Sequence, residues 1–321
     1  MRLVARAVLA LVLGALAAAS PAFAQSWPQT TVRLILPLGA GSATDVTARL
    51  YAERLAARWG QPVVVENRPG PDGLVAVAGF LAARDAHTLL FSIGGPVTIN
   101  PVSHETLAYD PDRDQVPIAP ASDSFLAIAA SASLGVTSID ALIARAKAEP
   151  GKLSWAATPG LPQFIFAGFL KSAGLDMVQV SYRDFSPALQ DLAEGRIQVV
   201  ATGLLPLLPL AQAGRVKLLA VTNRERSPAA PQLATAQEIG HPELSADGFQ
   251  GFFGWRDMPE ALRQRIAADV RAVAADPALA QKLAALGQAV RSGTPADFAA
   301  MIAEQRAKIA AIAQAIGLKK Q

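Results

Sequence analysis

The sequence contains no cysteine and only three histidines, His87, His104 and His241. Without cysteine the chain can form neither a disulfide framework nor a thiol nucleophile nor a cysteine-ligated metal site. No two of the histidines lie at a helical or hairpin spacing, which argues against a dedicated zinc site. We therefore expect a protein that uses neither a metal ion nor another cofactor.

The sequence also lacks an N-terminal apolar run long enough to anchor the chain. The run Ala7–Ala19 has 13 residues, whereas a membrane-spanning helix needs about 20. Arg2 and Arg6 precede this run, and the small-residue site Ala22–Ala24 follows it. This is the pattern of a cleavable signal peptide, so we predict export with cleavage after Ala24.

Neither sign of charge is in large excess. The formal net charge of the 321 residues is +3, and two of the positive charges, Arg2 and Arg6, belong to the predicted signal peptide. The mature chain is therefore nearly neutral, which gives no indication of a nucleic-acid partner or of binding to a charged membrane surface. Its length favours about two domains.

Strand-like and amphipathic segments alternate along most of the mature chain, as is typical of an α/β fold. The first three are a strand at 32–36, a helix at 45–59 that ends at Gly60, and a strand at 62–65. The passage 100–121 contains four prolines and is predicted to be rich in loops. A second series of strands and helices follows it, and the pattern closes with three helical stretches, the last at about 296–316.

This pattern predicts an α/β fold with two lobes, each a sheet flanked by helices. We expect the signal peptide at 1–24, the first part of lobe 1 at 25–123 and lobe 2 at 124–222. Residues 223–321 are expected to return to lobe 1 and to add its C-terminal helices.

The segment from Pro37 to Asp45 joins a predicted strand to a predicted helix through residues too small to shield the backbone. Exposed amides at a helix N-terminus suit an anion, and Ser42 and Thr44 add hydroxyl donors. Asp45 can cap the helix or accept a hydrogen bond from a bound group. The alternative is an ordinary capped helix start. A segment of the same design, 153–164, can face the first across a cleft, because open α/β sheets bind ligands at the carboxyl ends of their strands.

Two kinds of enzyme are alternatives to a binding protein. A dinucleotide site is suggested by Gly39 and Gly41 after a strand, but Thr44 stands where the third glycine of that fingerprint belongs. A hydrolase needs a nucleophile beside a base, and the sequence has no Gly-x-Ser-x-Gly motif. A secreted hydrolase or lyase would have to use a cleft carboxylate such as Asp45 or Asp184, and we expect no enzymatic activity.

Several segments recur in the same order in a known family. They are Val32–Pro37 with the loop that follows it, Gln61–Gly70, Ile99–Pro101, Tyr109–Pro111, Pro150–Leu153, Pro187–Leu192 and Leu218–Thr222. With these segments the mature chain resembles the periplasmic receptors of tripartite tricarboxylate transporters, often called the Bug family. The resemblance implies a two-lobed α/β fold of the periplasmic binding protein type, a periplasmic location and delivery of a captured solute to integral-membrane transporter subunits. It also implies that loop amides and ordered water hold the carboxylates of the ligand.

Departures from the family's pattern bear on the ligand. Gly94 and Gly95 belong to a cleft loop that has lost the family's usual polar residues, which leaves Thr98 as the nearest hydroxyl. The second lobe gains Phe164 in its cleft loop, and the segment 183–185 replaces the usual Lys-Gly with arginine, aspartate and phenylalanine. We expect a small carboxylate, with one or two carboxyl groups and an apolar or aromatic body. The alternative for each aromatic ring is a place in the core.

The predicted ligand-binding residues come from the cleft loops of both lobes. They are Leu38, Gly39, Ala40, Gly41, Ser42, Thr44, Asp45, Gly94, Gly95, Thr98, Thr158, Pro159, Gly160, Phe164, Arg183, Asp184 and Thr202. Arg183 can clamp a carboxylate with two hydrogen bonds or pair with Asp184. We expect a monomer with no catalytic residue, no metal and no nucleic-acid partner. A ligand sensor that contacts a regulatory protein is a further alternative.

Overall fold

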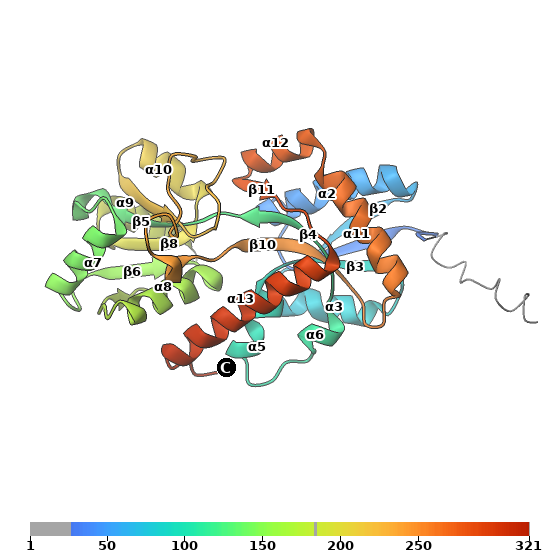
Figure 1. Cartoon of the computed structure of the whole chain (residues 1–321), viewed down its shortest axis with the longest axis horizontal. Coiled ribbons are helices and arrows are strands. Elements are labelled where there is room, and N and C mark those ends of the chain that lie inside the picture. Colours follow the sequence, from blue (N-terminus) through green and yellow to red (C-terminus); the bar gives the residue numbers. More distant parts are fainter. Residues whose placement is uncertain (1–26, 183–184, 321) are drawn as a thin grey trace, which may run out of the picture.

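Figure 1 shows two lobes side by side, each built on one β-sheet with helices around it. The computed structural model describes residues 27–182 and 185–320. The larger sheet has the strand order β11-β4-β10-β3-β1-β2, and the smaller has the order β7-β6-β8-β5-β9. The predicted two-lobed α/β architecture is confirmed. The predicted signal peptide lies outside the described residues.

The larger sheet is built from both ends of the chain. Its strands are β1 (Val32–Leu36), β2 (Val63–Asn67), β3 (Thr88–Ile93), β4 (Val116–Ser124), β10 (Gly248–Gly254) and β11 (Gln288–Val290). The helices of this lobe are α2 (Ala43–Trp59), α3 (Leu74–Ala83), α4 (Gly95–Thr98), α5 (Asn100–Ser103), α6 (Pro111–Asp114), α11 (Glu260–Ala274), α12 (Pro277–Ala285) and α13 (Pro295–Ala315), with the 3-10 turn η2 (Pro71–Gly73). Strand β1 runs parallel to β2 and β3, and β10 runs antiparallel to β3 and β4.

The smaller sheet uses only the middle of the chain. Its strands are β5 (Leu126–Ser131), β6 (Ser154–Ala157), β7 (Val178–Gln179), β8 (Val199–Gly203) and β9 (Val216–Val221). Its helices are α7 (Ile139–Ala148), α8 (Leu161–Ser172), α9 (Phe185–Glu194) and α10 (Leu208–Gln212), with the 3-10 turns η3 (Ala132–Leu134), η4 (Leu205–Leu207) and, on the way back, η5 (Pro242–Leu244). Strand β6 is parallel to β7 and β8, and β5 is antiparallel to β8 and β9.

The chain passes between the two sheets twice. Strand β4 of the larger sheet ends at Ser124, and β5 of the smaller one begins at Leu126. The return runs from the end of β9 at Val221 to the start of β10 at Gly248. Helix α13 packs on the larger sheet and reaches across to α8 of the other lobe (Figure 1). The predicted domain limits at 123/124 and 222/223 stay a prediction.

Helix α2 shows how local sequence fixes the element that follows β1. Ser42 is its N-cap, because its hydroxyl accepts a hydrogen bond from the amide of Asp45, so the helix begins two residues before the predicted start. Gly60 ends the helix in the left-handed conformation, with φ of 67°, and its amide donates to the carbonyl of Ala56. The predicted glycine C-cap is therefore confirmed.

The passage 100–121 contains a loop at 104–110 but more regular structure than its prolines predicted. It contains the short helices α5 and α6 and more than half of strand β4. Strand β4 accommodates its prolines at irregular points, since the pairing with β10 shifts register where Pro117 and Pro120 lie. On the other side, β11 pairs with β4 only at 122–124, so these prolines interrupt no ladder there. No strand was predicted at 248–254, where β10 forms the partner of β4.

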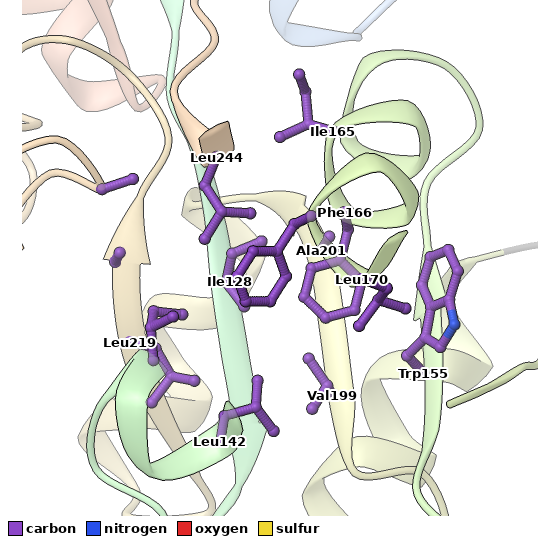
Figure 2. Close-up of a cluster of buried hydrophobic side chains, with 14 of the residues drawn as sticks. Ile128, Leu142, Trp155, Ile165, Phe166, Leu170, Val199, Ala201, Leu219 and Leu244 are labelled. Carbon is purple, nitrogen blue, oxygen red and sulfur yellow. The ribbon is translucent and has the colours of Figure 1, made fainter. Parts of the chain in front are cut away.

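Residues around Phe166 form the core of the smaller lobe, where Figure 2 shows them converging from α8 and the sheet. Phe166 is fully buried. The centroid of its ring lies 5.1 Å from that of Trp155 and 5.7 Å from that of Phe169. This packing fixes α8 on the sheet and therefore fixes the position of the turn that leads into it. No helix among the described residues is long and apolar enough to cross a membrane.

Replacing Phe166 with alanine should test this packing. The substitution leaves a cavity in a fully buried site, and we expect it to lower the free energy of unfolding by about 3–5 kcal/mol. Urea unfolding followed by circular dichroism measures the change. Val178→Ala, at a half-exposed position of β7, is the control and should stay within about 0.5 kcal/mol of the parent. A loss below about 1 kcal/mol for Phe166→Ala would show that this cluster does not hold the lobe together.

Candidate functional site

A cavity of about 180 Å³ lies between the two lobes, beside the first crossing of the chain. One lobe lines it with the turn between β3 and α4, the start of β10 and Gln305 of α13. The other lobe lines it with the turn between β6 and α8. Ser124 and Leu126, on either side of the crossing, complete the lining. The cavity thus lies at the carboxyl ends of β3 and β6, where open α/β sheets bind ligands.

The lining of the cavity is largely apolar. It consists of Ile93, Gly94, Gly95, Thr98, Ile99, Ser124, Leu126, Pro159, Gly160, Leu161, Pro162, Gly248, Phe249 and Gln305. None of these described residues carries a formal charge. Its volume is below the roughly 300–1,000 Å³ of pockets for drug-sized ligands, so the space suits a small solute.

The N-terminus of α8 presents open backbone amides at the cavity. Gly160 is its N-cap and has φ of 94°, a left-handed conformation that favours glycine, and it provides no side chain to cap the helix. Pro162 has no amide hydrogen. In the described part of the chain, the amides of Leu161 and Gln163 have no hydrogen-bond acceptor. These open amides and the positive end of the helix dipole favour a negatively charged group.

The loop between β1 and α2 is held from inside by Asp45. This side chain is buried, and its carboxylate accepts hydrogen bonds from the Gly41 amide at 2.9 Å, from Arg49 Nε at 3.1 Å and from Asn67 Nδ2 at 2.9 Å. Asn67 also donates to the carbonyl of Leu38 at 2.9 Å. Through Gly41 and Asn67 the carboxylate therefore braces the loop from inside. The helix cap itself is Ser42 and not Asp45, and whether Asp45 contacts a ligand stays a prediction.

The same contacts determine the charge of Asp45. Burial alone would raise its pKa, but the hydrogen bonds from Arg49, Gly41 and Asn67 outweigh burial and hold the pKa below its usual value. The carboxylate is therefore ionised at neutral pH. The charge lies on the inner side of the loop. Gly39, Ala40 and Gly41 are exposed, so the backbone of the loop remains accessible to a ligand from outside.

The loop and the first turn of α2 retain amides without a hydrogen-bond acceptor. Within the residues that the structure describes, no acceptor is bonded to the amides of Gly39, Ala40, Ala43 or Thr44. The loop adjoins the turn between β3 and α4 through Gly73, since a Cβ atom at Gly73 would lie 3.3 Å from Pro37 and 2.9 Å from Pro96. The loop therefore flanks the cavity without lining it.

The predicted ligand-binding residues fall into three groups. Those that line the cavity are Gly94, Gly95, Thr98, Pro159 and Gly160. Those outside its lining are Leu38, Gly39, Ala40, Gly41, Ser42, Thr44, Asp45, Thr158, Phe164 and Thr202. Arg183 and Asp184 lie outside the described residues, so the proposed carboxylate clamp at Arg183 stays a prediction.

Several of these side chains are engaged within the protein. The hydroxyl of Thr98 is buried and donates to the carbonyl of Gly94 at 2.8 Å. Thr158 and Thr202, at the ends of β6 and β8, are joined by their hydroxyl groups at 3.3 Å. Phe164 packs in the core of the smaller lobe, and Phe185 packs partly buried against the second cluster of that lobe. Both aromatic rings therefore lie in hydrophobic clusters of the smaller lobe, which was the alternative to a place in the ligand site.

Other contributors to the site were not predicted. The crossing segments supply Ser124, Leu126, Gly248 and Phe249, and α13 supplies Gln305. The predicted lobe boundary near residue 123 was the one sequence feature that pointed to this region, and it bears on Ser124 and Leu126. Among the described residues, no group of three histidine, aspartate or glutamate side chains could hold a metal ion.

Asp45→Ala should loosen the loop between β1 and α2. Removing a buried carboxylate with several hydrogen bonds is expected to lower the free energy of unfolding at pH 7 by about 1.5–3 kcal/mol. Because the folded pKa is lowered, this stabilisation is present above the unfolded pKa of about 3.9 and is lost as the pH falls through the folded value. The deficit of the variant, measured by urea unfolding, should therefore shrink below about pH 4. Glu105→Ala, an exposed carboxylate of the same lobe, is the control, and equal stability of both variants would contradict the role of Asp45.

Comparison with known proteins agrees with this fold. The model of the tripartite tricarboxylate transporter family receptor matches residues 47–318. A UPF0065 protein of Bordetella bronchiseptica is 32% identical over 92% of this chain and 88% of its own length. Protein BugT of Bordetella pertussis is 27% identical over 98% of this chain and 97% of its own length.

Solved structures agree as well. An R. palustris protein solved with adipate is 29% identical, with a TM-score of 0.77, over 92% of this chain and 100% of that one. The periplasmic binding protein BugD, 24% identical over 92% of this chain and 100% of its own, has the same fold with a TM-score of 0.73. The chain belongs to the receptor family of tripartite tricarboxylate transporters, as its sequence motifs indicated.

Proposed function

We propose that this receptor captures a small organic carboxylate between its two lobes in the periplasm and delivers it to integral-membrane transporter subunits. The observation that carries the proposal is the cavity between the lobes, whose described lining residues carry no charge, with the open N-terminus of α8 at its edge. The family membership and the relative solved with adipate support it.

The hydrogen-bonding groups of the described lining suit a carboxylate, although no lysine or arginine is among these residues. Among the lining residues, the amide of Leu161 can bind a carboxylate oxygen, and the hydroxyl of Ser124 is a further donor at the crossing. The amide of Gln163, in the same first turn of α8, lies just outside the lining and can bind a second oxygen. The free amides between Gly39 and Thr44 can serve a second carboxyl group or ordered water at the edge of the cavity. Backbone amides would hold the carboxylate of the ligand at a fixed position, because they do not move as a long side chain does.

The apolar residues of the lining indicate that the part of the ligand beyond its carboxyl group is apolar. Ile93, Ile99 and Leu126 provide aliphatic surface, and Phe249 provides one aromatic face. Phe164 and Phe185, which the sequence suggested for this role, pack in hydrophobic clusters of the smaller lobe. We therefore propose a carboxylate with an apolar body, and the observed lining suits an aliphatic chain at least as well as a ring.

Binding in this site requires closure and no covalent step. Both lobes line the cavity, so a ligand makes all its contacts only when the lobes are together. The ligand then favours the closed state by the difference between its affinities for the closed and the open state. None of the described lining residues is a carboxylate, histidine or lysine, so a hydrolase or lyase would find no base there. Recovery of unaltered ligand after incubation distinguishes the receptor from an enzyme.

A thermal-shift screen of the mature protein tests the proposed ligand class. We expect straight-chain dicarboxylates such as adipate, and monocarboxylates with apolar bodies, to raise the melting temperature more than citrate or malate. A ligand at 100 times its dissociation constant should add about 2.7 kcal/mol of stability. Stabilisation by citrate and malate, with no effect of the apolar carboxylates, would rule out the apolar site.

Gly95→Leu tests whether the cavity is where the ligand binds. Gly95 lines the cavity, and a Cβ atom there would meet no atom within 4 Å. The larger side chain should therefore fill the space without disturbing the fold and should weaken binding at least tenfold, as measured by isothermal titration with a carboxylate from the screen. Gly95→Ala is the matched control, with a smaller expected loss. Unchanged affinity in Gly95→Leu would place the site elsewhere.

A further inference from the structure

Arg291 reaches both segments that cross between the lobes. It follows β11 directly, and its amide donates to the carbonyl of Ala121 in β4 at 3.0 Å. Its Nη1 lies 2.7 Å from the carboxylate of Asp123 and 3.4 Å from that of Asp247. Asp123 is two residues before the first crossing at Phe125, and Asp247 is the last residue before β10.

Each of these aspartates precedes a residue of the cavity. Ser124 follows Asp123, and Gly248 follows Asp247, and both line the space between the lobes. A side chain that fixes the two aspartates therefore also fixes this part of the cavity wall.

We propose that Arg291 is a positioning residue that clamps the two crossing segments together and so sets how far the lobes close over the ligand. The part that concerns the ligand rests on the proposed function. The part that concerns closure stands on the geometry of the crossings alone.

The clamp differs from an ordinary surface ion pair. The side chains of Asp123 and Asp247 are 16% and 11% exposed, whereas Arg226 and Glu238, a pair in the returning segment, are 44% and 45% exposed. Exposed pairs contribute little, because water and salt screen them. A partly buried arginine between two carboxylates is screened less and holds its geometry.

Asp247 extends the clamp to the rest of the returning segment. Its carboxylate accepts a hydrogen bond from the amide of Arg224 at 3.0 Å, and its carbonyl accepts one from Gln305 of α13 at 2.7 Å. Arg224 also pairs with Glu304 of α13. The start and the end of the returning segment are thus joined to each other and to the helix that reaches both lobes.

The protonation of Asp123 should control the strength of the clamp. Burial raises the pKa of Asp123 to about 7, with Asp247 and Glu225 acting in the same direction and Arg291 opposing them. One carboxylate oxygen, Oδ1, is buried and has no hydrogen-bond partner in the described structure, so it is free to carry the proton. The charged groups that act on Asp123 are Arg291, Asp247 and Glu225. Asp247 and Arg291 in turn line a neighbouring pocket together with the charged residues Arg224, Asp297, Glu304 and Lys308.

The clamp and the global stability should respond to pH in opposite directions. Ionised Asp123 attracts Arg291, so the clamp is tighter above pH 7 and looser below it. The folded pKa is raised, however, so the stability that the protonated group contributes is lost as the pH rises through 7. A change in lobe geometry that follows the clamp is therefore not a by-product of general unfolding.

Interlobe distances measured without ligand test the clamp directly. Because the chain has no cysteine, spin labels can be placed at Ala82→Cys in α3 and Lys147→Cys in α7, both exposed positions. By double electron–electron resonance we expect a narrow distribution at pH 8.5 that broadens at pH 5.5. Arg291→Met should give the broad distribution at both pH values, and Asp123→Asn should remove the dependence on pH.

Arg54→Met is the matched control, because it breaks an ion pair with Asp276 at 2.7 Å that lies within one lobe. Its distance distributions should match those of the parent. Arg291→Met with parental distributions at both pH values would overturn the proposal. If Arg291→Met does not fold by circular dichroism, Arg291→Lys takes its place, and it should show a weaker clamp with the pH dependence retained.

Binding of adipate as a probe links the clamp to the site. We expect Arg291→Met to bind adipate about tenfold more weakly than the parent. A parent protein that binds no adipate would contradict the proposed ligand class, while the ligand-free distances would still decide the role of Arg291. Equal affinity of the parent and Arg291→Met would contradict the link between clamp and site.

Discussion

The antiparallel pairing of β4 with β10 is the constraint on which the rest of this structure depends. These strands carry the chain toward and back from the smaller lobe, and their backbone hydrogen bonds hold the two crossings side by side. The two lobes therefore share a double connection, and the loops at the carboxyl ends of β3 and β6 meet beside it. The cavity, the proposed closure and the ion pairs of Arg291 all follow from this arrangement.

Local signals in the sequence were enough to predict many of the helices and strands. The helix expected at 45–59 is α2, and the last helix expected at about 296–316 is α13, because a cap, a periodic apolar face and a stop were all encoded nearby. Strands β4 and β10 were not predicted, because their strand structure depends on pairing between segments far apart in the sequence. Pro117 and Pro120 make the sequence of β4 look like a loop. The segment is a strand only because it pairs with the distant β10, with register shifts near the two prolines.

The site was harder to predict than the fold, for physical reasons that individual residues show. The turns at Gly94 and Gly160 were accessible from the strand, loop and helix pattern. The inward role of Asp45 depends on Asn67 at the end of a neighbouring strand, and the place of Phe164 depends on the rotation of α8 about its axis. Gln305 reaches the cavity from a helix near the other end of the chain, which no local pattern can indicate.

In the proposed function, the two lobes close over a small carboxylate with an apolar body, and backbone amides hold its charged group. Native mass spectrometry of the mature protein, purified without denaturation, can identify the compound that stays bound. The bound compound is expected to be an organic acid with one or two carboxyl groups and a mainly hydrocarbon body. A sugar, a cation or a compound without a carboxyl group in the bound state would contradict it.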